Sequence, residues 1–306
     1  MISASGVRIG WADLPTPVRA AVEATLGSRV VRASTQAGGF SPGTADRVVT
    51  ETGDRAFVKA VGTVLNPHSV EFARAELRVS AALPDDAPTP AVLGSYDDGD
   101  WVALILEDID GRHPRTPWVE DEIDATVTAL RRLAATLTPS PLPDAPRAAD
   151  RLADDLAGWV AIAADPIAGL DPWAAAQLDD LQASAARGLA ALADGDTLTH
   201  CDIRADNLLV RRDGRIVVVD WPWGCVGPAW LDTVLLAINV IVHGGDGDRV
   251  LAGIDPRHAT DVITGLTGYF LHQGRLPDPP GLPTVRAFQR AQGDALLPWL
   301  RGRHAP

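Results

Sequence analysis

A histidine, two aspartates and an asparagine stand at a spacing that could support phosphoryl transfer. His200, Asp202 and Asn207 lie within LTHCDIRADNLLV, and Asp220 follows the next apolar run. Such chemistry needs one carboxylate that accepts or orients the proton of a hydroxyl nucleophile. It also needs oxygen ligands for Mg²⁺, a hard cation, and an amide oxygen with a second carboxylate would supply them. The pattern therefore predicts a phosphoryl-transfer loop followed by a metal-binding aspartate.

The chain contains a single lysine among its 27 Lys and Arg residues. This residue, Lys59, ends the run RAFVK, whose apolar side chains predict a strand. A kinase-type fold places a compact ammonium group on such a strand to hold nucleotide phosphates, and the broad guanidinium of arginine is a poor substitute. Codon bias alone would also leave few lysines. The position in a strand, ahead of a helix that carries a glutamate, favours a functional role.

Length and composition describe an ordinary globular protein. The chain has 306 residues, of which 46% are hydrophobic and 22% are charged, so it is long enough for two lobes. No apolar run of 18 residues predicts a membrane span, and the N-terminus does not resemble a secretory signal. Its two cysteines, Cys201 and Cys225, are too few for a disulfide framework or a four-ligand zinc site. We therefore expect a cytoplasmic protein without a membrane partner.

The formal net charge of −13 bears on the choice of partner. A strongly acidic protein repels phosphate backbones, so we expect no nucleic-acid partner. An acidic cleft would attract a cationic small molecule. A general role of the charge in solubility is the favoured interpretation.

The first third of the chain predicts a small antiparallel sheet with one main helix. Hydrophobic periodicity favours helices over residues 15–26 and 68–83. Alternating patterns and turn residues predict five strands over residues 29–35, 44–50, 55–60, 91–95 and 101–106. Residues 107–114 are polar, and we interpret them as an irregular crossover into a second lobe.

The remainder predicts a larger, mainly helical lobe. Helices are expected over residues 118–137, 147–164, 171–193, 230–242, 256–272 and 284–299. Asp171 is a candidate N-cap with Pro172 at the first helical position. A hairpin over residues 208–210 and 216–219 would present Asn207 and Asp220. The fold class is thus α+β, with a nucleotide-binding lobe over residues 1–107, a helical lobe with the catalytic loop and substrate site over 108–306, and a nucleotide in the cleft between them.

The sequence resembles the aminoglycoside phosphotransferase family, small-molecule kinases with a bilobal protein-kinase-like fold, whose relatives include choline and homoserine kinases. HCDIRADN, residues 200–207, is similar to the catalytic loop of that family, and VDW, residues 219–221, is similar to its metal-binding segment. The resemblance covers the whole chain in the order of its elements. It implies a Mg²⁺-dependent transfer of the γ-phosphate of ATP or GTP to a hydroxyl group of a small molecule.

The resemblance also implies roles for individual loop residues. Asp202 would be the catalytic carboxylate, Asn207 and Asp220 would bind Mg²⁺, and His200 would brace the loop by hydrogen bonds. Arg204 either contributes charge at the γ-phosphate or forms a salt bridge with Asp206 or another acid.

Two further loop positions are judged against the family pattern. Cys201 departs from the glycine that is common in the family between the histidine and the aspartate, and a nucleophilic role is not indicated. Asp232 matches an aspartate that braces the catalytic loop, and we treat it as structural.

Residues of the first lobe complete the predicted nucleotide site. Lys59 should pair with Glu76 of the following helix, with Glu71 as the rival partner on another helical face. The segment GGFSPG, residues 38–43, joins the first two strands. Gly38, Gly39 and Ser41 are candidate phosphate contacts there, but the spacing is not Gly-x-Gly-x-x-Gly, and no Walker-type P-loop exists in the sequence.

The acceptor substrate is less constrained. Trp221, Trp223 and Trp230 either stack on a substrate ring or belong to the core. The last eight residues contain no acid, which argues against a polycationic aminoglycoside, although four acids on the expected helices could replace it: Asp154, Asp155, Asp179 and Asp180. An antibiotic is the leading substrate class by resemblance. The alternatives are a metabolic kinase for choline, homoserine or a sugar amine, and an inactive nucleotide-binding regulatory protein.

Overall fold

The computed structural model describes residues 8–36, 42–279 and 283–304. Within these residues the chain forms two compact units. The sheet unit holds the described residues up to 113 together with residues 206–224. The helical unit holds residues 114–205 and the described residues from 225 onward. The chain thus leaves the sheet unit after His113 and returns to it for one hairpin directly after the predicted catalytic loop.

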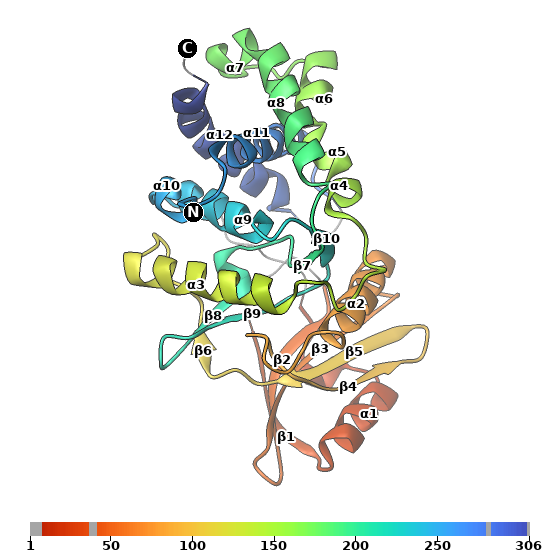
Figure 1. Cartoon of the computed structure of the whole chain (residues 1–306). Coiled ribbons are helices and arrows are strands. Elements are labelled where there is room, and N and C mark those ends of the chain that lie inside the picture. Colours follow the sequence, from red (N-terminus) through yellow and green to blue (C-terminus); the bar gives the residue numbers. More distant parts are fainter. Residues whose placement is uncertain (1–7, 37–41, 280–282, 305–306) are drawn as a thin grey trace. The chain divides into compact units, whose positions relative to one another are not determined.

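The sheet unit is built on five antiparallel strands in the order β1-β2-β3-β5-β4 (Figure 1). Their bounds are β1 (Val30–Thr35), β2 (Thr44–Thr50), β3 (Arg55–Gly62), β4 (Val92–Asp97) and β5 (Trp101–Glu107). All five match the expected strands within a few residues. The central strand β3 is paired on both sides, which fixes the backbone around Lys59.

One helix covers each face of this sheet. The helix α1 (Thr16–Leu26) follows the short 3₁₀ turn η1 (Trp11–Asp13) and packs Val22 against Val48, Val58 and Ile105. The helix α2 (Pro67–Ser80) packs Val70 against Val61, Val102 and Leu104 on the opposite face. Asn66 caps α2 by accepting a hydrogen bond from Ser69 N at 3.1 Å. The strands β2, β3 and β5 are therefore largely buried, and α2 shares a face with the predicted phosphate lysine.

A second, three-stranded sheet carries the predicted metal-binding residues. Its order is β6-β8-β9, with β6 (Gly111–Arg112), β8 (Leu208–Arg211) and β9 (Ile216–Val218). The β8–β9 hairpin is the one expected from the sequence, and Gly214 at its turn has a φ of 83°. The expectation that residues 107–114 are irregular is wrong at β6. Glycine suits position 111, because a Cβ added there would lie only 3.1 Å from the Val210 carbonyl oxygen of the paired strand.

The helical unit contains the remaining helices, some of them very short. They are α3 (Glu120–Thr136), α4 (Ala148–Arg151), α5 (Ala153–Leu156), α6 (Gly158–Ala164), α7 (Pro172–Ala176), α8 (Leu178–Ala191), α9 (Leu231–Val242), α10 (Gly247–Val250), α11 (Pro256–Gln273) and α12 (Val285–Arg303). Two short strands, β7 (Thr197–Thr199) and β10 (Cys225–Gly227), pair antiparallel. The β7 strand leads directly into the predicted catalytic loop.

Two expected helices are interrupted. The helix expected over residues 147–164 consists of α4, α5 and α6, and the one over 171–193 consists of α7 and α8. Single residues separate the pieces, and backbone hydrogen bonds such as Leu156 N to Leu152 O continue the helical path. Because the apolar spacing runs through these interruptions, periodicity alone does not reveal them. Asp171 caps α7 as expected, accepting hydrogen bonds from Trp173 N and Ala174 N.

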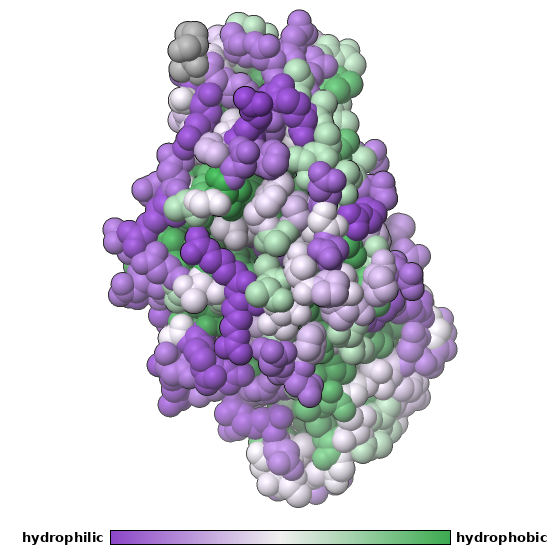
Figure 2. Space-filling model, in the orientation of Figure 1, coloured by the Kyte–Doolittle hydropathy of each residue, from purple (hydrophilic) through white to green (hydrophobic). Residues whose placement is uncertain are grey.

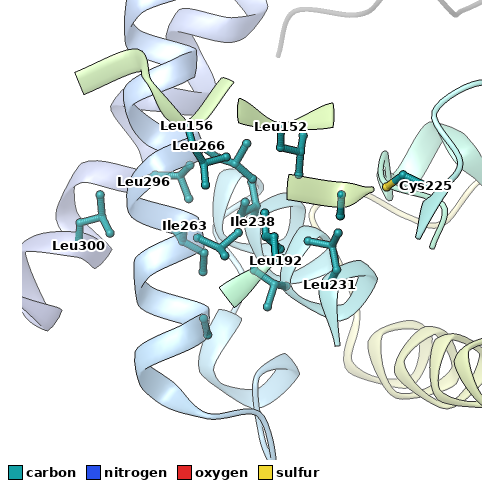
Figure 3. Packing of buried hydrophobic residues seen from close by; sticks show 14 residues of the cluster. Leu152, Leu156, Leu192, Cys225, Leu231, Ile238, Ile263, Leu266, Leu296 and Leu300 are labelled. Carbon is teal, nitrogen blue, oxygen red and sulfur yellow. The ribbon is translucent and has the colours of Figure 1, made fainter. Parts of the chain in front are cut away.

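The core of the helical unit lies where α5, α8, α9, α11 and α12 meet (Figure 3). Leu156, Leu266 and Leu296 point toward one another there, and Cys225 lies at the edge of the same cluster. Leu231, Val234 and Ile238 of α9 are buried in this cluster. Asp232 lies near the start of α9, so the helix that packs in this core also carries a residue that contacts the predicted catalytic loop.

Hydrophilic residues cover much of the face of the molecule that Figure 2 shows. None of the helices in the described ranges is long and apolar enough to cross a membrane.

Candidate active site

Lys59 contacts two carboxylates in the sheet unit. Its Nζ lies 2.5 Å from Glu76 Oε2 and 2.5 Å from Asp220 Oδ1. Glu71, the rival partner, is exposed and lies 3.9 Å from His68 instead. Burial opposes the charge of Lys59, but the neighbouring Asp220 and Glu76 raise its pKa above the ordinary value. The ammonium group is therefore charged at every pH at which the protein would work.

Asn207 and Asp220 lie at the same end of the β8–β9 hairpin. Val219 N donates a hydrogen bond of 3.0 Å to Asn207 O, which ties the residue before β8 to the residue that precedes Asp220. Asn207 is buried, whereas the Asp220 side chain is 41% exposed. Asp220 has a left-handed backbone with φ 69°, a conformation that aspartate tolerates better than most residues.

This donor set fits a magnesium ion. One carboxylate and one amide oxygen are hard ligands, and Mg²⁺ commonly takes few protein ligands because substrate phosphates and water complete its shell. Within the described residues, no group of three or more His, Cys, Asp or Glu side chains could hold a metal ion. A site that relied on protein ligands alone, such as a structural zinc site, is thus not formed by the described part of the chain.

The predicted catalytic loop lies in the helical unit, directly after β7. His200 is fully buried, and its Nδ1 accepts a hydrogen bond of 3.2 Å from Asp202 N. The backbone N–H groups of His200 and Cys201 donate to the two oxygens of Asp232 at 2.8 and 2.9 Å. Burial raises the pKa of Asp232, and the neighbouring His200 and the two donors oppose that rise. His200 and Asp232 therefore hold the loop backbone around Asp202.

Asp202 itself is only partly buried, with a side-chain exposure of 25%. Arg204 NH1 lies 3.5 Å from Asp202 Oδ1, and the guanidinium lies 6.0 Å from the centre of the Phe288 ring. The structure thus places Arg204 beside an acid, and that acid is the predicted catalytic carboxylate.

Cys201 has a left-handed backbone with φ 64°, the conformation for which glycine is best suited. Interaction with Cys225, together with burial and the nearby acids Asp232 and Asp202, raises the pKa of the Cys201 thiol. A thiol with a raised pKa is a poor nucleophile. This agrees with the expectation that Cys201 does not act as one.

The glycine-rich segment is only partly described. Gly38, Gly39 and Ser41 lie outside the described residues. Gly43, which follows them, has φ 114°, and an added Cβ would lie 2.4 Å from the Ala60 carbonyl oxygen. Gly43 also accepts a hydrogen bond of 3.2 Å from Ile9 N. This position therefore requires glycine.

The three tryptophans occupy different environments. Trp221 is buried, and its Nε1 donates to Val218 O at 3.2 Å, so its ring is not an accessible stacking surface. Trp230 stacks on His258 in the helical unit, with ring centres 5.6 Å apart. Trp223 is 37% exposed and lies 4.9 Å from the Phe72 ring. Of the three, Trp223 is the one with an accessible aromatic surface near Asp220 in the sequence.

Two polar residues of the helical unit, Tyr269 and Gln289, were not singled out from the sequence, whereas Asp155 was one of the four candidate acids. Burial raises the pKa of Tyr269 to about 12, and Asp155 and Asp202 add to this effect. Gln289 Nε2 lies 3.3 Å from Tyr269 Oη, and Gln289 Oε1 accepts from Arg286 at 2.9 Å. Burial, assisted by Asp154, raises the pKa of Asp155 to about 6. Tyr269 and Gln289 lie on α11 and α12, more than 60 residues from the loop, and no local motif marks them.

Similar proteins show the same fold. Choline kinase LicA from Streptococcus pneumoniae has 12% sequence identity and a TM-score of 0.61, with 92% of this chain and 98% of that chain covered. A mutant of aminoglycoside phosphotransferase APH(4)-Ia, in a ternary complex with AMP-PNP and hygromycin B, has 15% identity and a TM-score of 0.59, covering 95% and 100%. The ADP-bound aminoglycoside phosphotransferase APH(2'')-Ib has 16% identity and a TM-score of 0.57, covering 93% and 99%.

No curated protein matches the sequence. The model of the phosphotransferase enzyme family does match it, over residues 37–260. This range includes Lys59, Asp202 and Asp220, and it spans well over half of the chain. The expected α+β, protein-kinase-like fold is thereby confirmed. The chain belongs to the phosphotransferase enzyme family and is an enzyme.

Proposed function

We propose that this enzyme is a Mg²⁺-dependent O-phosphotransferase that moves the γ-phosphate of ATP or GTP to a hydroxyl group of a small molecule. The observation that carries the proposal is the contact of Lys59 with both Glu76 and Asp220. A buried glutamate that orients a lysine toward phosphates, beside a metal-binding aspartate, is the arrangement that phosphoryl transfer requires. The functional division would be a nucleotide-binding lobe over residues 1–107 and a lobe with the catalytic loop and substrate site over 108–306.

Each residue has a role in this reaction. Lys59, held by Glu76, binds the α- and β-phosphates. Asn207 and Asp220 hold Mg²⁺, which supplies charge neutralisation of the phosphate oxygens when bound.

The catalytic loop acts on the acceptor. Asp202 accepts a hydrogen bond from the substrate hydroxyl and aligns its oxygen for in-line attack on the γ-phosphorus. Arg204, whose NH1 lies 3.5 Å from Asp202 Oδ1, contributes positive charge at the γ-phosphate. His200 keeps the loop backbone in place through the hydrogen bond that Asp202 N donates to it.

The acceptor is proposed to be an antibiotic that is inactivated by phosphorylation. One similar structure holds hygromycin B, and another is a choline kinase, so a metabolic kinase for choline, homoserine or a sugar amine is the alternative. Tyr269 would contact the acceptor together with Asp155 and Gln289, because Asp155 and Asp202 both raise the pKa of Tyr269 and Gln289 Nε2 lies 3.3 Å from its hydroxyl oxygen. Together they offer a carboxylate, a neutral phenol and an amide, which suit a hydroxylated molecule with few cationic groups.

Two experiments test the proposal. A mass-spectrometric screen of hydroxylated natural products, with Mg²⁺ and either ATP or GTP, should show a gain of one phosphoryl group on at least one compound. A sensitive bacterial strain that expresses the protein should then tolerate that compound if it is an antibiotic. Transfer to choline or homoserine alone, with no gain in tolerance across an antibiotic panel, would support the metabolic alternative. No nucleotide turnover with any acceptor would support the inactive regulatory protein.

A further inference from the structure

Helix α9 contacts the predicted catalytic loop at two points. Near the start of α9, Asp232 accepts hydrogen bonds from the backbone N–H groups of His200 and Cys201. Seven residues later, Asn239 Oδ1 accepts a hydrogen bond of 3.2 Å from the backbone N–H of Ala205. Seven residues make about two helical turns, so both side chains lie on one face of α9. The loop between these contacts contains Asp202.

Asn239 Oδ1 serves a second donor as well. Trp118 Nε1 donates to the same oxygen at 3.0 Å. Asn239 and Trp118 are 4% and 8% exposed, so neither donor can turn to bulk water. Two N–H donors that converge on one atom identify that atom as the amide oxygen, because an amide NH₂ group accepts no hydrogen bond.

The two donors mark the places where the chain enters and leaves the helical unit. Trp118 lies four residues after Pro114, the first residue of the long segment 114–205 of this unit. Ala205 is the last residue of the same segment, directly before Asp206 of the sheet unit. A single buried oxygen thus holds both ends of the segment. Asp202 lies three residues before the second of these ends.

We propose that Asn239 is a positioning residue for phosphoryl transfer. This inference rests on the proposed function. Asp232 holds the start of the catalytic loop, and Asn239 holds its end at Ala205. Because both ends of the catalytic loop are hydrogen-bonded to α9, the carboxylate of Asp202 keeps a single orientation. Misplacement of a catalytic group by about 1 Å can lower a rate about 100-fold, so such a brace has a large kinetic effect.

Three variants separate this role from general packing. Asn239→Leu roughly keeps the volume of the side chain but removes the oxygen that accepts hydrogen bonds from Trp118 Nε1 and Ala205 N. Asn239→Asp keeps an acceptor oxygen. Trp118→Phe is the matched control, because it removes the other donor and leaves the Ala205 contact intact.

Two readouts are needed. The first is amide hydrogen exchange in peptides that cover residues 203–207, which does not depend on activity. The second is kcat and the KM for ATP, measured with Mg²⁺ and the acceptor that the mass-spectrometric screen identifies, or with water as acceptor. Thermal unfolding shows that each variant is folded at the assay temperature.

The proposal predicts that Asn239→Leu speeds exchange at residues 203–207 and lowers kcat about 100-fold, with the KM for ATP nearly unchanged. Asn239→Asp should restore most of kcat, and Trp118→Phe should keep kcat within about twofold while lowering the unfolding temperature. Unchanged exchange in Asn239→Leu would overturn the brace. Faster exchange with unchanged kcat, or an equal loss of kcat in Trp118→Phe, would overturn the positioning role. Failure of the proposed function would look different, since the wild-type protein would then turn over neither ATP nor GTP.

Discussion

Lys59 Nζ lies 2.5 Å from Asp220 Oδ1, although 161 residues separate them in the chain. The lysine comes from the central strand of the five-stranded sheet, and the aspartate follows the β8–β9 hairpin. In the proposed reaction, Lys59 would exchange one of its two carboxylate partners for a phosphate oxygen of the nucleotide. Glu76, with a side-chain exposure of 5%, is the partner that would keep its place.

Replacement of Lys59 tests this arrangement. Lys59→Met keeps the length of the side chain but removes the charge, and it leaves Glu76 buried without its cation. We expect turnover to fall about 100-fold because charge stabilisation at the phosphates is lost. The free energy of unfolding should also fall by about 2–3 kcal/mol, as expected when one partner of a largely buried ion pair is removed. The checks are steady-state kinetics and urea unfolding.

The matched control for this variant is Lys59→Met combined with Glu76→Gln. Because glutamine is neutral, the double variant should recover most of the lost stability and none of the lost turnover. Recovery of turnover in the double variant would contradict a direct role of the ammonium group.

Removal of the Asp220 charge should weaken the binding of Mg²⁺-nucleotide. Asp220→Asn is the suitable change, because asparagine tolerates the left-handed backbone at φ 69° and leaves the fold intact. Isothermal titration with ATP should show at least about tenfold weaker binding in the presence of Mg²⁺ and little change in its absence. Equal binding of wild type and variant with Mg²⁺ present would remove Asp220 from the metal site.

Cys201 allows a test of backbone strain at the catalytic loop. A non-glycine residue in the left-handed region costs about 1–2 kcal/mol, and Cys201 has φ 64°. Cys201→Gly and Cys201→Ala both remove the thiol, but only glycine relieves the strain. The glycine variant should therefore be about 1 kcal/mol more stable than the alanine variant in chemical unfolding, after the extra freedom of glycine in the unfolded chain is allowed for. The opposite order would show that the loop is not strained at this residue.

The raised pKa of Asp155 makes stability depend on pH. Its folded value of about 6 lies above the ordinary value of 3.8, so the folded state binds more protons than the unfolded state between these pH values. Stability from this group is therefore complete below pH 3.8 and is lost as pH rises through 6. Asp155→Asn should stabilise the protein at pH 7 by about 2 kcal/mol, with a much smaller gain at pH 4.5.

The comparison of urea unfolding at the two pH values provides the measurement. Asp179→Asn is the control, because Asp179 is an exposed helical aspartate. Its effect should be small and equal at both pH values. An Asp155 variant that behaves like this control would show that Asp155 ionises normally.

The local signals in the sequence account for most of the fold. Strands such as β2 and β3 were predictable because alternating residues and tight turns act over a few neighbours. The breaks between α4, α5 and α6 were not, since the apolar spacing continues through them. The strand β6 was missed because two residues carry no periodic pattern, and its pairing with β8 is a long-range contact.

The candidate site shows the same division. The loop from His200 to Asn207 and the pairing of Lys59 with Glu76 follow from spacing along the chain. Asn239 and Tyr269 could not be found in this way, because an amide or phenol on a helix is ordinary in sequence. Only folding brings Asn239 Oδ1 to the Ala205 amide and Tyr269 close to Asp202.

The most direct test of phosphoryl transfer compares the wild-type protein with Asp202→Ala on one acceptor found by the screen. Transfer of the γ-phosphate from ATP or GTP and the affinity for Mg²⁺-nucleotide are measured side by side. The wild-type protein should phosphorylate the acceptor, whereas Asp202→Ala should bind nucleotide with nearly the same affinity and transfer no detectable phosphate. Transfer at the wild-type rate by Asp202→Ala would contradict the assignment of this carboxylate and, with it, the mechanism.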